Sequence, residues 1–228
     1  TAIPEYCPDL ARIVDTAGQI RLREKTLGEG KLTISGSIRV SVLYTSEESP
    51  GLRSLSLTLP FSCKVDDKRE CDMIALDSRL LLLEVKMLGS RKLYVRALPE
   101  FRVRGWRRVR RKLCCGASGS EGLQVLRQQT ILPLMTDVWE QECSIAQEIP
   151  AEGSTDDVSD LLMDRMFLRI NSCQQFGSKL VVKGDAALSM LCRGDTLESK
   201  QVTVPFSQII DGEDLPEDGI MMQINWER

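Results

Sequence analysis

Residues 30–44, GKLTISGSIRVSVLY, alternate between apolar and polar side chains. A period of two is typical of a strand with one face buried and the other in water. Residues 178–192, SKLVVKGDAALSMLC, repeat this line in the same phase. We therefore predict two long strands, each of which buries its even-numbered face. The apolar even positions are Leu32, Ile34, Ile38, Val40, Val42 and Tyr44 in the first copy, and Leu180, Val182, Ala186, Leu188, Met190 and Cys192 in the second.

The repetition continues after these strands. Residues 197–207, LESKQVTVPFS, are similar to residues 52–62, LRSLSLTLPFS, and we predict that each segment forms a second strand. The proline in each favours an edge strand, because proline cannot donate to a ladder. Gly36 and Gly184 hold the same place in the two long strands and predict a bulge or bend. Length differences fall in the turns, as expected for two copies of one folding unit.

A short helix is predicted ahead of each long strand. Residues 3–14 and 149–162 both begin with Ile-Pro, pass through a turn-rich spacer and then place apolar residues at i, i+3 and i+4. That spacing puts three side chains on one helix face. The three are Leu10, Ile13 and Val14 in the first copy, and Val158, Leu161 and Leu162 in the second.

A hairpin follows in the first copy only. Residues 78–106 read as two strands turning at Gly89-Ser90, with Leu93, Val95 and Ala97 alternating on the return. The fold class expected is mainly β, with two tandem β-sandwich-like repeats, each carrying one short helix. We predict a first repeat over 1–112 with its N-terminal strand missing, a Gly/Ser-rich linker over 113–122, and a second repeat over 123–228 with its C-terminal hairpin missing. Residues 126–150 are expected to be extended and to lead into the second repeat.

The net charge of −3 is the sum of a positive first half and a negative second half of the chain. Residues 1–128 carry 23 Lys+Arg against 15 Asp+Glu, whereas residues 129–228 carry 7 against 18. Opposite halves can associate head to tail, or the first half can bind an acidic partner. The basic run RVRGWRRVRRK is the candidate partner-binding site, and its residues are Arg102, Arg104, Trp106, Arg107, Arg108, Arg110, Arg111 and Lys112.

The basic run has three interpretations. It can dock an acidic protein, including the second half of a neighbouring chain, or it can bind a nucleic acid, with Trp106 stacking on a base, a polyanionic glycan or anionic lipid headgroups. It can also be the solvated side of a β-ribbon. Nucleic acid is not expected, because the chain is acidic overall and carries no recognised nucleic-acid motif.

Composition argues against an enzyme. The chain has no histidine, so Ser-His-Asp and Cys-His nucleophile pairs are excluded. Its eight cysteines show no C-x-x-C spacing, and the acidic residues Glu213, Asp214, Glu217 and Asp218 lack the EF-hand spacing. We expect no catalytic residues, no metal and no cofactor. No apolar run is long enough for a transmembrane helix.

The cysteines themselves permit two readings. Cys114 and Cys115, beside the basic run, are either activated thiols or ordinary reduced thiols of a cytosolic protein. Cys192 lies in phase with the apolar face and is expected to be a small core residue.

The repeated sequence motifs together resemble those of a known family. Ile-Pro followed by Pro-Asp, then a G-x-K-L strand ending in Leu-Tyr, then L-P-F-S, are similar to the SPOCS domain of endospore-forming Firmicutes. That domain occurs, often in tandem, in spore-coat morphogenetic proteins of the SpoVID and SipL kind. The second copy has Ser154-Thr155-Asp156 in place of Pro-Asp. The resemblance covers nearly all of 1–112 and 123–228.

The resemblance implies a non-enzymatic scaffold. Family members of this kind bind other coat proteins, including the ATPase of the coat's basement layer, in the mother-cell cytoplasm at the forespore surface. The alternative expectation is a polyanion- or envelope-binding β module that acts through the basic run. No catalytic residue is implied by the family.

Overall fold

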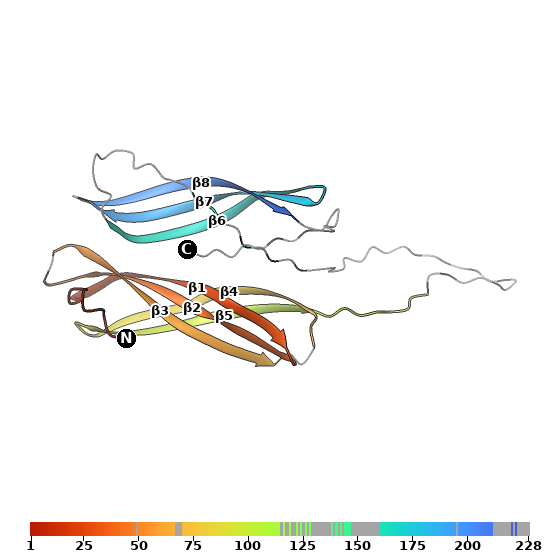
Figure 1. Ribbon diagram of the computed structural model, residues 1–228, viewed down its shortest axis with the longest axis horizontal. Helices are drawn as coiled ribbons and strands as arrows, with labels where there is room; N and C mark the ends of the chain where they lie inside the picture. Colours follow the sequence, from red (N-terminus) through yellow and green to blue (C-terminus); the bar gives the residue numbers. More distant parts are fainter. Residues whose placement is uncertain are drawn as a thin grey trace.

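The computed structural model describes residues 1–48, 50–66, 70–114, 160–194 and 196–211, with isolated positions between 116 and 146 and at 220 and 222. Within these residues the chain forms antiparallel strands and no helix, which confirms the mainly β fold class (Figure 1). The strands make three sheets, of order β1-β2-β3, β4-β5 and β6-β7-β8. Their bounds are β1 Arg12–Gly28, β2 Lys31–Thr45, β3 Leu52–Asp66, β4 Met73–Gly89, β5 Lys92–Trp106, β6 Asp160–Phe176, β7 Lys179–Arg193 and β8 Leu197–Asp211.

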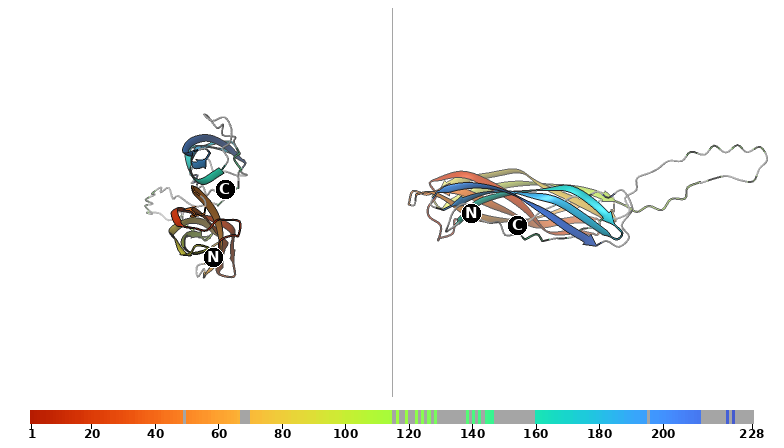
Figure 2. Two further views of the ribbon diagram at one scale, coloured as in Figure 1. Left: turned by 90° about the vertical axis from the view of Figure 1, so that its left-hand side faces the viewer. Right: turned by 90° about the horizontal axis from the view of Figure 1, so that it is seen from above.

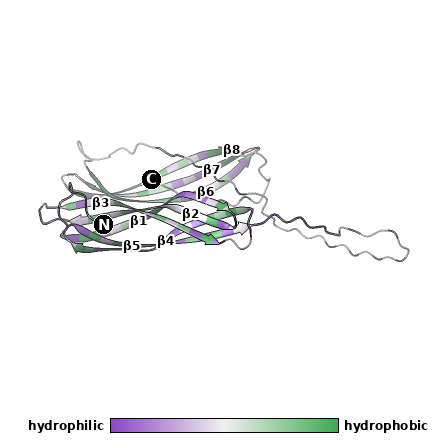
Figure 3. Ribbon diagram, turned by 60° about the horizontal axis from the view of Figure 1, so that its bottom comes forward, coloured by the Kyte–Doolittle hydropathy of each residue, from purple (hydrophilic) through white to green (hydrophobic). Residues whose placement is uncertain are grey.

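The two predicted long strands are β2 and β7. All six predicted apolar residues of β2 are buried, and Ile34, Val40 and Val42 have no exposed surface. In β7 four of the six are buried, including Cys192, and Leu188 and Met190 are half-buried. Alternation of hydropathy along the strands is visible in Figure 3. The predicted register, with the even-numbered face inward, is confirmed.

The predicted helix of the first copy is wrong, and the described end of the second predicted helix, Leu161 and Leu162, lies in a strand. Ile13 pairs with Tyr44 in β1, and Leu161 pairs with Cys192 in β6. Val14 and Leu162 are the extra residues of β-bulges that follow these pairs. A bulge places two residues opposite one, so adjacent apolar residues imitate the i+3, i+4 spacing of a helix. Residues 149–159, which include Val158, lie outside the described residues, so the rest of the second helix stays a prediction.

Strands β1 and β6 carry a second bulge each, which explains why their alternation is hidden in the sequence. The register shifts lie between Leu22 and Glu24 in β1 and between Ile170 and Ser172 in β6. Each shift moves the inward side chains from even to odd positions. Because strand bounds, order and bulges recur, the third sheet is a structural copy of the first.

Gly36 and Gly184 are required by the bulge of the neighbouring strand. A Cβ at Gly36 would lie 2.1 Å from the Arg21 carbonyl oxygen and 3.0 Å from the Phe61 ring. At Gly184 the equivalent atoms belong to Arg169, at 2.3 Å, and to Phe206, at 2.5 Å. The predicted association of these glycines with a bulge is correct, but the extra residue is in β1 and β6.

The predicted hairpin is β4–β5, and it covers the even-numbered face of the first sheet. Ile38, Val40 and Val42 share one core with Leu93 of β5, whereas Leu32 and Ile34 share a second with Leu76 of β4. These two sheets form a two-layer sandwich, as Figure 2 shows from the end. The repeat boundaries at 112 and 123 stay a prediction.

The N-terminal segment closes one end of the sandwich. Ile3, Cys7 and Leu10 are buried, and Thr1 and Leu93 exchange two backbone hydrogen bonds. Arg91, in the β4–β5 turn, donates to the carbonyl oxygens of Pro4 (3.0 Å) and Cys7 (3.1 Å) and pairs with Asp9 at 2.6 Å. Hydrogen bonds from Ser90 and Arg91 lower the pKa of Asp9. The turn therefore holds residues 1–10 against the core.

Replacing Arg91 with alanine should loosen this segment without unfolding the sandwich, because it removes three contacts at its surface. Hydrogen exchange at the amides of Ile3 and Leu10 should become at least several-fold faster, while exchange in β7 stays unchanged. Protonation of Asp9 on acidification through its lowered pKa should likewise reduce the protection of these two amides, measured as exchange relative to the intrinsic rate at the same pH. Asp9 has a lower pKa in the folded protein than in the unfolded chain, so its ionised form stabilises the fold when the pH is above the unfolded-state pKa. This stabilisation is lost as the pH falls through the folded-state pKa. Unchanged exchange at Ile3 would contradict this role.

Candidate docking surface

The outer face of the β4–β5 hairpin carries exposed leucines. The inner face of the hairpin packs on the first sheet, so alternate residues point away from the protein. Leu82 lies opposite Leu98, and the β-bulge between Leu80 and Leu82 adds Leu81. These three side chains are 50% (Leu81), 41% (Leu82) and 48% (Leu98) exposed. We call them the leucine patch.

Charged pairs flank the leucine patch on both sides. Toward the end of β5, Glu100 accepts hydrogen bonds from Arg79 and, at 3.1 Å, from Arg102. The bond from Arg79 is the main reason that the pKa of Glu100 lies below its ordinary value. Toward the turn, Lys86 pairs with Glu84 at 2.5 Å. Such exposed pairs add little stability but fix where charge is presented.

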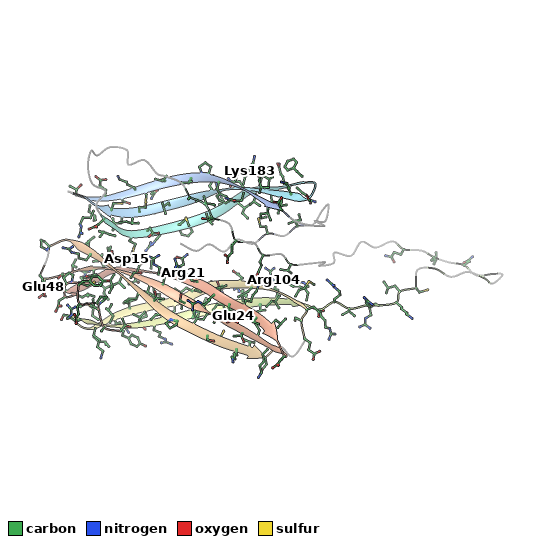
Figure 4. The ribbon with its side chains drawn as sticks, in the orientation of Figure 1. Asp15, Arg21, Glu24, Glu48, Arg104 and Lys183 are labelled. Atoms are coloured by element: carbon green, nitrogen blue, oxygen red, sulfur yellow. The ribbon has the colours of Figure 1, made fainter. Side chains whose placement is uncertain are left out.

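The basic run continues this face beyond the strand. Strand β5 ends at Trp106, and residues 107–112 are exposed and in no regular structure. Asp72 anchors their start, because its amide donates to the Trp106 carbonyl (2.8 Å) and its carboxylate accepts from the Arg108 amide (2.5 Å). Figure 4 shows Arg104 near the end of β5 where this segment leaves. We call residues 107–112 the basic segment.

The predicted site residues divide between these two parts. Arg102, Arg104 and Trp106 lie on β5, where Trp106 is half-buried, so its ring is not a free stacking surface. The cations of the basic segment form no ion pair within the described part of the chain. They are Arg107, Arg108, Arg110, Arg111 and Lys112. The docking surface proposed below is the outer face of β4–β5 together with the basic segment.

Sequence reasoning missed the leucine patch. The signal was present in the four consecutive leucines, residues 80–83, since a strand cannot turn four neighbours inward. Leu80 and Leu83 face the core and Leu81 and Leu82 face solvent. What the pattern did not give is the position of the bulge, which decides which leucines are exposed.

The described residues show which chemistry this surface can offer. They contain no group of three or more side chains that could hold a metal ion. They form strands only, so no helix long and apolar enough to span a membrane is found among them. Cys114 and Cys173 are exposed free thiols, Cys7 and Cys192 are buried free thiols, and Cys115 and the acidic residues 213–218 lie outside the described residues. The docking surface can therefore bind by apolar contact and by charge pairing, with an excess of positive charge.

Comparison with known families gives a match over part of the chain. Residues 9–80 match the family model described as SipL, SPOCS domain. The match spans the first sheet and the beginning of β4. No curated protein and no solved structure matches the chain significantly. Residues 9–80 are therefore similar to a SPOCS domain, which agrees with the resemblance of the sequence motifs, and the tandem repeat is supported only in part, because residues 160–211 are not matched.

Proposed function

We propose that the protein is a non-enzymatic scaffold or adaptor that binds other spore-coat proteins during coat assembly on the forespore. The observation that carries this proposal is the SPOCS match over residues 9–80. The partners would be coat proteins, among them the ATPase of the basement layer, and the site of action would be the mother-cell cytoplasm at the forespore surface.

The docking surface supports binding of a protein. Exposed leucines at neighbouring positions of the paired strands β4 and β5 are a suitable apolar centre, and charged residues around them make a polar rim. Its outer-face cations outnumber its carboxylates, and the basic segment adds five more. An acidic partner with an apolar anchor fits this chemistry, and the charges would steer its approach.

Imaging of the tagged full-length protein in sporulating cells tests the proposal. We expect fluorescence to encircle the forespore, because a coat scaffold is retained by its partners at that surface. The tag alone, expressed at the same level, is the control and should stay diffuse. Diffuse signal of the tagged protein throughout sporulation would overturn the proposed function.

The alternative function is binding of a polyanion or of the cell envelope through the basic segment. Its exposed arginines, unpaired within the described part of the chain, favour it. Binding to DNA or anionic vesicles that weakens steeply with salt would support this alternative. Absence of such binding at modest salt would exclude it and leave the protein partner.

A further inference from the structure

The third sheet contacts the first sheet at one corner, which contains a small apolar cluster. Leu43 of β2 is 4% exposed because it packs with Leu162 and Met163 of β6. Ala17, Leu52 and Leu191 surround these three. Figure 1 shows the third sheet lying over the five strands of the first two sheets. We call this contact the corner.

Polar contacts surround the corner. The Arg165 guanidinium donates to the Asp15 carboxylate at 2.7 Å, and Arg193 donates to the Leu52 carbonyl oxygen at 2.9 Å. Figure 4 shows Asp15 on the side of the first sheet that faces the third. The contact therefore has an apolar centre and a charged rim, which is the composition of a protein–protein interface.

The corner uses the same positions of both copies of the repeated sheet. Strands β1 and β2 correspond to β6 and β7 with a constant offset, so Leu43 is the counterpart of Leu191. Asp15 corresponds to Met163, and Ala17 to Arg165. Thus Asp15 pairs with Arg165, which is the counterpart of Ala17. In turn, Ala17 packs in one cluster with Met163, which is the counterpart of Asp15. A region that binds its own counterpart has the self-complementarity of a homotypic interface.

The strand pairing does not require that the two sheets of the corner belong to the same molecule. Among the described strands, no hydrogen-bonded pair joins the third sheet to the first, and residues 107–159 connect β5 to β6. A connection of that length can reach a neighbouring molecule. The same side chains would meet if the third sheet came from a second copy, and exchange of identical elements is an economical route to a dimer.

We propose that the corner binds the third sheet of a second copy of this chain, so that two molecules associate by exchanging their third sheets. This inference does not rest on the spore-coat function. It gives self-association a defined surface, whereas the sequence suggested only attraction between oppositely charged halves. The occupant is a second copy because the corner already accepts that sheet within one chain.

Two single charge reversals test the exchange. Asp15→Arg places two cations at the corner, and Arg165→Asp places two carboxylates there. Neither variant can restore the pair alone, within a chain or between identical chains. In a mixture, an exchanged dimer restores it twice, because the introduced arginine of one chain meets the introduced aspartate of the other, while the unaltered Asp15 and Arg165 meet each other. The two side chains are about half exposed, so both cores should be unaffected.

The variants are annealed separately and as an equimolar mixture at high protein concentration, and dimers are then counted by native mass spectrometry. We expect about tenfold more dimer in the mixture than in either variant alone, with mixed dimers in large excess over dimers of one variant. The double variant Asp15→Arg/Arg165→Asp restores the ion pair with the two charges exchanged. It should therefore form as much dimer as the original chain. A mixture with no more dimer than its components would overturn the proposal.

Discussion

Alanine at Gly36 should lower the free energy of unfolding by about 3 kcal/mol or more, the range of severe core substitutions. The added Cβ would lie 2.1 Å from the Arg21 carbonyl oxygen, and a backbone atom held in a β-ladder cannot move away cheaply. The Phe61 ring, 3.0 Å away, would also have to shift. Thermal denaturation followed by circular dichroism should show a fall in the melting temperature of roughly 10 °C.

Gly28→Ala and Gly89→Ala are matched controls. Both glycines end a strand, and a Cβ at either would meet no atom within 4 Å. Their melting temperatures should remain within about 2 °C of the original, because neither change creates a clash. Gly184→Ala should destabilise the third sheet as Gly36→Ala does the first. Equal stability of Gly36→Ala and Gly28→Ala would show that the bulge does not crowd the glycine.

Charge reversal of the basic segment is expected to weaken capture of coat partners at least tenfold. Glutamate at Arg107, Arg108, Arg110 and Arg111 turns the positive part of the docking surface negative, so an acidic partner would be repelled. The four side chains are exposed and outside the strands, so the fold should be unchanged. Quantitative pull-down of coat proteins from sporulating cells, with the tagged protein as bait, measures the effect.

Four exposed cations outside the docking surface provide the control. Glutamate at Arg23, Lys31, Lys64 and Lys183 changes the net charge equally but alters only the first and third sheets. This control should retain most of the capture, because its charges are away from the hairpin. Equal losses in the two variants would mean that net charge, and not the docking surface, governs binding.

The alternation of apolar residues was enough to predict the strands that have no bulge. Strands β2 and β7 follow the even-numbered pattern throughout, and the Gly89-Ser90 turn places Leu93 in the core as expected. Strands β1 and β6 could not be read in this way, since two bulges in each change the phase of the inward side chains. Pairing with β2 and β7 overrides the local helical spacing.

The docking surface was only partly predictable. The basic segment is visible in the sequence because its charges are consecutive. The leucine patch depends on the bulge at Leu81, and the corner depends on how two distant sheets meet. Long-range packing of that kind leaves no period in the sequence, which is why Leu43 and Met163 could not be paired in advance.

Site-specific photo-cross-linking in sporulating cells shows directly whether the outer face of β4–β5 binds coat proteins. A photoreactive amino acid replaces Leu98 in the leucine patch or, as the control, the exposed Thr58 on the outer face of the first sheet. We expect adducts with coat proteins from position 98 and few or none from position 58. Adducts from position 58 alone, or none from either position, would contradict this expectation.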